Sequence, residues 1–278
     1  MTAVSGAASA LPRARVPWVD RGGGGLGGDG AGRAVGAGAE GAGDGDDAGA
    51  GGDRAGAPPG LGGFPWERAA ALGPFVLADG SAAAEQPTGV RVARDRRALY
   101  VRFDCADRDA WGTWRRRNDP IYLEEAVEVF LAPGTAAPRR YWELEVSPLG
   151  VLFAARIENP TGRRAGLVAD TGWECPGLEW QAGPAGPAAA GERRGGGQDW
   201  WAALAIPWDA LAGGPGAPGG PSRPPPRLWR ANFYRIERPR GGRPELSCWS
   251  PTWTEPPDFH RPERFGVLEL APCPSGSR

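Results

Sequence analysis

A two-residue periodicity runs through most of the apolar segments of this 278-residue chain and constrains its fold more than any other feature. Apolar side chains occupy every second position, and polar residues such as Glu128, Glu143 and Glu145 lie between them. This period places alternate side chains on opposite faces of an extended strand, whereas a helix would repeat every three to four residues. The periodic segments are 88–92, 99–105, 126–131, 141–146, 151–157, 200–206, 229–236 and 265–270.

The periodic segments are joined by glycine, proline and aspartate turns. Helical patterns are confined to two short segments, 66–71 and 208–211. Many short strands that do not alternate with helices favour antiparallel sheets over a parallel α/β arrangement. We therefore expect an all-β fold, an antiparallel two-sheet β-sandwich of the jelly-roll or immunoglobulin-like type.

Three glycine-rich segments interrupt the periodic sequence, at 20–63, 183–197 and 213–226. The first has almost no large apolar residue, so burial offers little to offset the entropy lost on ordering. We expect all three segments to be flexible insertions in a single domain over residues 13–271. Roughly 200 residues then remain for the core, which is a common domain size.

Charge and hydropathy exclude two classes of partner. The formal net charge of -1 lacks the basic surplus of a nucleic-acid-binding protein, and no apolar run is long enough for a membrane span. The first 20 residues lack a basic start followed by a sustained apolar stretch, so we expect a cytoplasmic protein. Cys105, Cys175, Cys248 and Cys273 lack metal-ligand spacing and are expected to be buried or free thiols.

Aromatic, arginine and proline residues are concentrated between Trp229 and Leu270. In an extended strand over 229–236, Ala231, Phe233 and Arg235 share one face, and their neighbours share the other. The proline-rich turn that follows is expected to present Trp249, Trp253, Phe259 and His260. Rigid rings and guanidinium groups are typical of recognition surfaces, although each ring taken alone also suits a core position.

A series of motifs in consistent order resembles the carbohydrate-binding modules of family 9 and their family-9-like relatives in the DOMON-like sandwich group. The motifs are PWERA, LYVRFDCADRDAW, NDPIYLEEAVEVFL, YWELEVSPLGVLFAARI, WAALAIPWDAL, RANFYRIER, SCWSPT and DFHRPERFGVLEL. The resemblance extends over 13–271, with 15–19 similar to the first strand and the glycine-rich segment inserted after it. It implies a two-sheet sandwich that holds a sugar between two parallel aromatic rings.

The resemblance also implies particular site residues. Tyr122, just before the segment 126–131, and Phe259, before the closing strand, match the two ring positions. Glu128 matches a sugar-contacting carboxylate, whereas Glu145 stands where the family has an arginine, which leaves the identity of the sugar open. Calcium supports some family members. Four aspartates between residues 104 and 119 form no recognisable ligand loop, namely Asp104, Asp107, Asp109 and Asp119. Structural calcium therefore stays open, and no other cofactor is expected.

The residue types independently suit a sugar. A pyranose has apolar C–H faces and a hydroxyl edge, so its binder needs flat rings and polar groups in one plane. Tyr122 and Phe259 are the candidate platforms. The candidate edge groups are Glu128, Asn232, Arg235 and Asp258, with Trp111 and His260 as further candidates. Alternatively, Glu128 lies on a solvated strand face and Arg235 in a surface ion pair. The expected ligand is a mono-, oligo- or polysaccharide, with a separate glycoside hydrolase as a partner in its breakdown.

Other functions have less support in the sequence. His260 has no G-x-S-x-G nucleophile as partner, and a glycosidase needs two carboxylates about 5 to 10 Å apart across a cleft. Alternating glutamates on strands are more typical of a solvent-facing side. A haem-binding, electron-transfer DOMON-like domain needs axial histidine or methionine ligands, and the chain has one of each. A protein-interaction sandwich without a sugar ligand stays open as a third interpretation.

Overall fold

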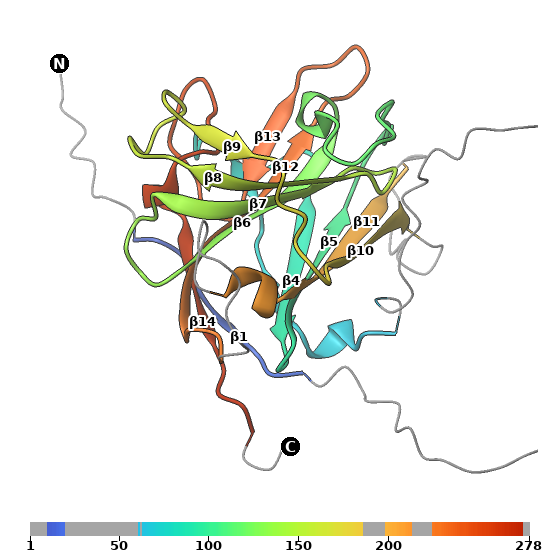
Figure 1. The fold of residues 1–278 in the computed structure, drawn as a ribbon. Coiled ribbons are helices and arrows are strands. Elements are labelled where there is room, and N and C mark those ends of the chain that lie inside the picture. Colours follow the sequence, from blue (N-terminus) through green and yellow to red (C-terminus); the bar gives the residue numbers. More distant parts are fainter. Residues whose placement is uncertain (1–9, 20–60, 62, 186–197, 213–223, 275–278) are drawn as a thin grey trace, which may run out of the picture.

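The computed structural model describes residues 10–19, 61, 63–185, 198–212 and 224–274, which form two β-sheets packed as a sandwich (Figure 1). The larger, nine-stranded sheet contains β1 (Arg13–Val16), β3 (Val76–Leu77), β6 (Ala126–Pro133), β7 (Arg140–Val146), β8 (Leu152–Glu158), β9 (Val168–Asp170), β12 (Leu228–Glu237), β13 (Glu245–Cys248) and β14 (Gly266–Leu270). The smaller, five-stranded sheet contains β2 (Ala70–Leu72), β4 (Thr88–Arg94), β5 (Ala98–Cys105), β10 (Glu179–Pro184) and β11 (Trp200–Pro207). The expected all-β sandwich is therefore confirmed.

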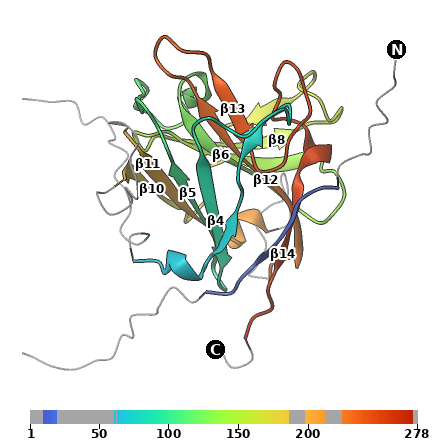
Figure 2. The ribbon, with the colours of Figure 1, turned by 180° about the vertical axis from the view of Figure 1, so that it is seen from behind.

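The strand order explains how distant segments meet. The larger sheet runs β1-β14-β12-β6-β7-β8-β9, with β13 and β3 extending from β12, and the smaller sheet runs β10-β11-β5-β4-β2. All pairs of named strands are antiparallel except β1 and β14, which pair in parallel from Arg13 opposite Val267 to Val16 opposite Leu270. Figure 2 shows this pair, blue beside red, so both ends of the described chain join one edge of the larger sheet.

The core lies between the two sheets and follows from the two-residue period. On β6 and β7, Val127, Val129 and Leu144 face the smaller sheet and are fully buried. On β12, Ala231 and Phe233 belong to the same core, whereas Tyr234 and Ile236 lie on the opposite face, as expected from their alternation. The side chains between these core residues therefore project from the outer face of the larger sheet.

The structure corrects several expected boundaries. The helical pattern at 66–71 is a 3-10 turn, Trp66–Arg68, followed by β2, because Ala70 to Leu72 pair with β4. The other helical segment is a 3-10 turn as well, Asp209–Leu211. None of the helical turns in the described part of the chain has the length and apolar character needed to cross a membrane. The first strand is Arg13–Val16 rather than 15–19.

The glycine-rich insertions fall mostly outside the described residues, namely 20–60, 62, 186–197 and 213–223. The second was expected to begin at residue 183, but Gly183 and Pro184 end β10 and pair with β11. Proline is tolerated there because β10 lies at the edge of its sheet and needs no further N–H donor.

The cysteines are free thiols, as expected. Cys105, Cys175 and Cys248 are buried and Cys273 is exposed. Burial raises the pKa of each of the three buried thiols to about 12, so they remain protonated at neutral pH.

Candidate functional site

The outer face of the larger sheet is covered rather than open to solvent. It carries a second apolar cluster, which includes Phe130, Tyr141, Phe153 and Tyr234 from four adjacent strands. Side chains from the connecting segments, among them Ile121, Trp114, Leu167 and Phe259, pack on this cluster. The segments that cover the face therefore determine what can reach its polar residues.

The segment after β13 is fastened to this face by buried polar side chains of β12. The Asn232 amide donates to the Ser250 carbonyl at 2.8 Å and accepts from the Ser250 N–H at 2.9 Å. The Tyr234 hydroxyl donates to the Phe259 carbonyl at 2.9 Å, and the Phe259 ring stacks on Tyr234 with centroids 4.2 Å apart. Phe259 is only 6% exposed, so the expectation that the turn presents its ring to solvent is wrong. Asn232 is fully buried, and its amide orders this segment.

Carboxylates shape the segment between β5 and β6 that carries Tyr122. Asp119 accepts hydrogen bonds from the backbone N–H groups of Arg115 and Arg116 at 3.1 and 2.8 Å, and Glu124 accepts one from Thr113 at 2.7 Å. These bonds lead into the 3-10 turn Ile121–Leu123. The half-buried Tyr122 ring of this turn meets Phe153 edge to face, with centroids 5.7 Å apart.

Two carboxylates lie between these aromatic contacts. The register defines a cross-strand row on the outer face, which we call the carboxylate row: Tyr234, Glu128, Glu145 and Phe153. Adjacent strands lie about 4.8 Å apart, so the row spans roughly 14 Å. Phe259 packs on the Tyr234 end and Tyr122 on the Phe153 end. The structure thus brings the two candidate platforms to either side of Glu128.

A third carboxylate, Glu143, lies on the same face of β7 two residues before Glu145, and we call Glu128, Glu143 and Glu145 the acidic trio. The three are 2%, 6% and 0% exposed, so the solvated strand face considered for Glu128 is wrong. Neither carboxylate oxygen of Glu145 receives a hydrogen bond from an N–H or hydroxyl group, and its hydrogen-bonding neighbour is the carboxyl of Glu143. Burial, and then repulsion between the carboxylates, raises the pKa values of Glu128 and Glu145 well above their usual range. Burial raises the pKa of Glu143 to about 7.

His260 and Asp258 border the same face. The imidazole Nδ1 of His260 is 2.8 Å from the Tyr141 hydroxyl oxygen, and its ring packs on Phe130 with centroids 5.2 Å apart. Burial lowers its pKa to about 3, so the ring is neutral and mostly enclosed rather than presented. The Asp258 carboxylate accepts a hydrogen bond from the backbone N–H of His260 at 3.1 Å. It also lies 4.0 Å from the exposed guanidinium of Arg164.

Arg235 and Trp111 lie away from the carboxylate row. Arg235 is opposite Val127 on β6, so its side chain and that of Glu128 project from opposite faces of the sheet. Its fully buried guanidinium binds Asp107 at 2.8 Å and also binds Glu237. Trp111 belongs to this region, since its backbone N–H donates to the Glu125 carboxylate at 3.3 Å. Neither the sugar contact nor the surface ion pair expected for Arg235 agrees with this position.

The carboxylates around Arg235 are the residues best placed to hold a metal ion. One carboxylate oxygen from each of four residues lies within 4.8 Å of the others; the four are Asp107, Asp109, Glu125 and Glu237. We call these four residues, together with Arg235, the Arg235 cluster. Burial raises the pKa of Glu125 to about 9 and that of Glu237 to about 7. The guanidinium already supplies a cation to two of these groups, so a metal ion would compete with it. Asp104 is not part of the group and binds Arg91 and Arg102.

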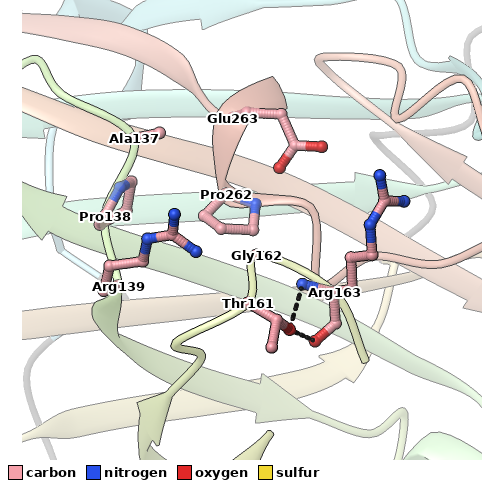
Figure 3. Close-up of a pocket in the computed structure, with 8 residues that line it drawn as sticks. All are labelled: Ala137, Pro138, Arg139, Thr161, Gly162, Arg163, Pro262 and Glu263. Atoms are coloured by element: carbon pink, nitrogen blue, oxygen red, sulfur yellow. Dashed lines mark hydrogen bonds between the residues drawn. The ribbon is translucent and has the colours of Figure 1, made fainter. Parts of the chain in front are cut away.

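Two surface depressions lie outside the carboxylate row. One of about 190 Å³ is bordered by Arg139, Arg163 and Glu263, and Figure 3 shows the Thr161 hydroxyl bonded to the Arg163 backbone there. The other, of about 350 Å³, is lined by residues including Trp18 and Arg68. Neither contains a member of the acidic trio.

The profile of carbohydrate-binding family 9 matches residues 84–270, which is more than half of the chain and contains the whole carboxylate row. The chain belongs to carbohydrate-binding family 9. The resemblance inferred from the sequence motifs is therefore confirmed, and the family is one of carbohydrate-binding domains. The family match favours carbohydrate binding over the electron-transfer interpretation.

Solved structures and a curated relative are similar to the chain. A candidate carbohydrate-binding protein from Bacteroides uniformis is 20% identical, with a TM-score of 0.51 over 73% of this chain and 87% of that one. A family 9 module from Caldicellulosiruptor kristjanssonii in complex with glucose is 13% identical, with a TM-score of 0.48 over 96% of this chain and 99% of that one. An extracellular protein from Arthroderma benhamiae is 32% identical over 79 residues, which are 28% of this chain and 36% of the relative. The match therefore spans about a third of that relative.

Sequence reasoning missed part of the site. Glu143 and Glu145 were treated as solvent-facing residues, and neither Tyr234 nor Phe153 was considered. The alternation held a signal, because Tyr141 has the same phase as both glutamates and is a large aromatic residue that suits burial.

Proposed function

We propose that the chain binds its saccharide over the acidic trio, with Tyr122 and Phe259 on either side of the ligand. The observation that carries this proposal is the state of Glu145, which is fully buried while neither of its carboxylate oxygens receives an N–H or hydroxyl donor and its hydrogen-bonding neighbour is another carboxyl, that of Glu143. Other polar groups of this face, such as Asn232 and Tyr234, bond to the covering segments. A buried polar group without a partner is costly, and a ligand rich in hydroxyl groups supplies the missing donors.

The two rings have different roles in this proposal. Phe259 is fixed on Tyr234 and forms one wall. Tyr122 lies half-buried on a three-residue turn and touches Phe153 only edge to face. Because the acidic trio is almost fully enclosed, ligand entry requires movement of a covering group, and the half-buried ring of Tyr122 on its short turn is such a group. We therefore assign Tyr122 as the ring that swings out and then closes on the sugar.

We further propose that binding is not accompanied by hydrolysis. A glycosidase places an ionised carboxylate and a protonated acid on opposite sides of the scissile bond. Glu128 and Glu145 instead project side by side from one face of the sheet. Breakdown of the bound saccharide then belongs to a separate glycoside hydrolase.

The Arg235 cluster supports a second part of the proposal, that the fold needs no calcium. Its four carboxylates already surround a guanidinium, which binds two of them directly. A divalent cation at the same place would be repelled by Arg235.

A glycan array followed by titration calorimetry tests the site. Tyr122→Ala should weaken binding of a saccharide found on the array by about 1 to 3 kcal/mol, the scale of burying one such ring. Tyr122→Trp should preserve or strengthen it, because the larger ring covers more of the sugar. Glu128→Gln should also lose affinity, since a carboxylate forms stronger, charge-assisted bonds with hydroxyl groups than an amide does.

The matched control is Trp253→Ala. Trp253 is 49% exposed and packs against Gly80 and Arg264, outside the carboxylate row, so its removal should leave affinity unchanged. Phe259→Ala is unsuitable, because removal of a buried phenylalanine costs about 3 to 5 kcal/mol of stability. Equal affinity of the wild type, Tyr122→Ala and Glu128→Gln, with intact melting transitions, would place the sugar elsewhere.

A further inference from the structure

We infer that the acidic trio selects a saccharide that carries a positive charge, an amino sugar with a free ammonium group. This inference rests on the proposed function and names the ligand class of the same site. Three carboxyl groups, those of Glu128, Glu143 and Glu145, converge on one enclosed face, and no N–H or hydroxyl group donates to either oxygen of Glu145.

The Arg235 cluster shows how this chain otherwise treats buried carboxylates. There, Asp107 and Glu237 bind the fully buried guanidinium of Arg235. No buried cation accompanies the acidic trio among the described residues. The cation that acts on all three of its members is Arg164, whose side chain is 69% exposed and pairs with Asp258 instead. The acidic trio is therefore a group of the same kind that lacks a resident cation.

An ammonium group fits this arrangement chemically. Glu128 and Glu145 are directly opposite on adjacent strands, so their Cβ atoms lie about 5 Å apart and one small donor can bridge their carboxylates. Ammonium offers three N–H donors and a charge, and charge-assisted bonds are roughly twice as strong as neutral ones. A hydroxyl group at the same place donates once and leaves the repulsion between the carboxylates unrelieved. An N-acetyl group carries no charge and is larger.

The same charges predict how binding depends on pH. As the pH falls, the acidic trio takes up protons and loses its charge-assisted bonds, and burial has raised the pKa of Glu143 to about 7. In alkaline solution the amine of the ligand loses its proton, as α-amino groups do near pH 8. Affinity should therefore pass through a maximum near neutrality. The titratable and charged groups that face or border the acidic trio are Tyr122, Tyr141, Arg164, Tyr234, Asp258 and His260.

Titration calorimetry on the full chain tests the inference with three β-1,4-linked trimers, of glucosamine, N-acetylglucosamine and glucose, and with spermidine as an amine without a sugar. The glucosamine trimer should bind about tenfold more tightly than the other two, which is the difference between charged and neutral hydrogen bonds. Glu145→Gln should remove most of this preference and change glucose-trimer affinity little. Glu158→Gln, an exposed glutamate of the neighbouring strand that pairs with Arg140, should keep it.

Each outcome is decisive. Equal affinity for the three trimers would overturn the amino-sugar inference but leave the proposed function intact, whereas no binding of any saccharide would remove both. Spermidine bound as tightly as the glucosamine trimer would show a general cation site and overturn the inference. If Glu145→Gln does not fold, the wild-type pH profile decides: a maximum near neutrality for the glucosamine trimer alone supports the inference, and parallel profiles for all trimers contradict it.

Discussion

Replacement of Arg235 by methionine should cost the protein a large part of its stability. The guanidinium is fully buried, binds Asp107 and Glu237, and donates to the Ala106 carbonyl at 2.6 Å. Methionine keeps an apolar stem of similar length but leaves these carboxylates without their cation. Removal of one partner from a buried ion pair costs about 3 to 5 kcal/mol. We expect a loss in this range at pH 8.

The loss should shrink on acidification, because the orphaned carboxylates can then be protonated. In the folded wild type, burial already raises the pKa of Glu237 to about 7, from an ordinary value of 4.5. Without the guanidinium, which lowers the pKa of Glu237, this pKa rises further. A carboxyl whose folded pKa exceeds its unfolded value loses its contribution to stability as the pH rises through the folded pKa. The difference between variant and wild type should thus be smaller at pH 5 than at pH 8.

Urea denaturation at both pH values measures the effect. The control is Arg227→Met, since Arg227 pairs with Glu269 at 2.5 Å on the surface with 73% of its side chain exposed, and such pairs contribute about 0 to 1 kcal/mol. A double variant with Glu237→Met should recover part of the loss. Equal losses for Arg235→Met and Arg227→Met would refute the account of a buried, guanidinium-centred cluster.

Three further predictions concern the fold. Stability should fall as the pH rises from 7 to 9, because burial raises the pKa of Glu125 to about 9 and the folded state then binds more protons than the unfolded state; a melting temperature that is constant or rises over this range would contradict it. Chelation by EDTA should leave the melting temperature unchanged, because Arg235 supplies the cation of its cluster, whereas a drop of several degrees would indicate a bound metal. Gly266→Ala should cost about 1 to 3 kcal/mol, since a Cβ there would lie 2.3 Å from a tryptophan ring and 2.8 Å from a backbone oxygen. Gly89→Ala, where the nearest atom is 4.0 Å away, is its control, and equal melting temperatures of the two variants would refute this packing argument.

The two-residue period predicted the principal strands and their faces, but it could not predict what covers each face. Alternation correctly separates Val127 and Val129 from Glu128. Whether Glu128 meets water depends on the segments after β5 and β13, whose paths are determined by irregular contacts such as Asp119 with the backbone. Burial of the acidic trio was therefore not visible in a pattern that normally marks a solvated face.

Arg235 shows the opposite case, in which the pattern held the answer. It has the same phase as Phe233, which lies in the core between the sheets, so alternation alone places its side chain on the inner face. The residue type, rather than the phase, led to the prediction that Arg235 contacts the hydroxyl edge of a sugar. Strands such as β3 and β9 were missed for another reason, since two or three residues are too few to reveal a period.

The most direct test of the binding site is a map of backbone amide shifts in 15N-labelled protein during titration with a saccharide. The largest changes should fall on Glu128, Glu145 and Tyr122. The chemical shifts of amides that line the two surface depressions, such as those of Thr161 and Ala69, should not change. Large shifts around either depression, with β6 and β7 unchanged, would contradict a saccharide bound over the acidic trio.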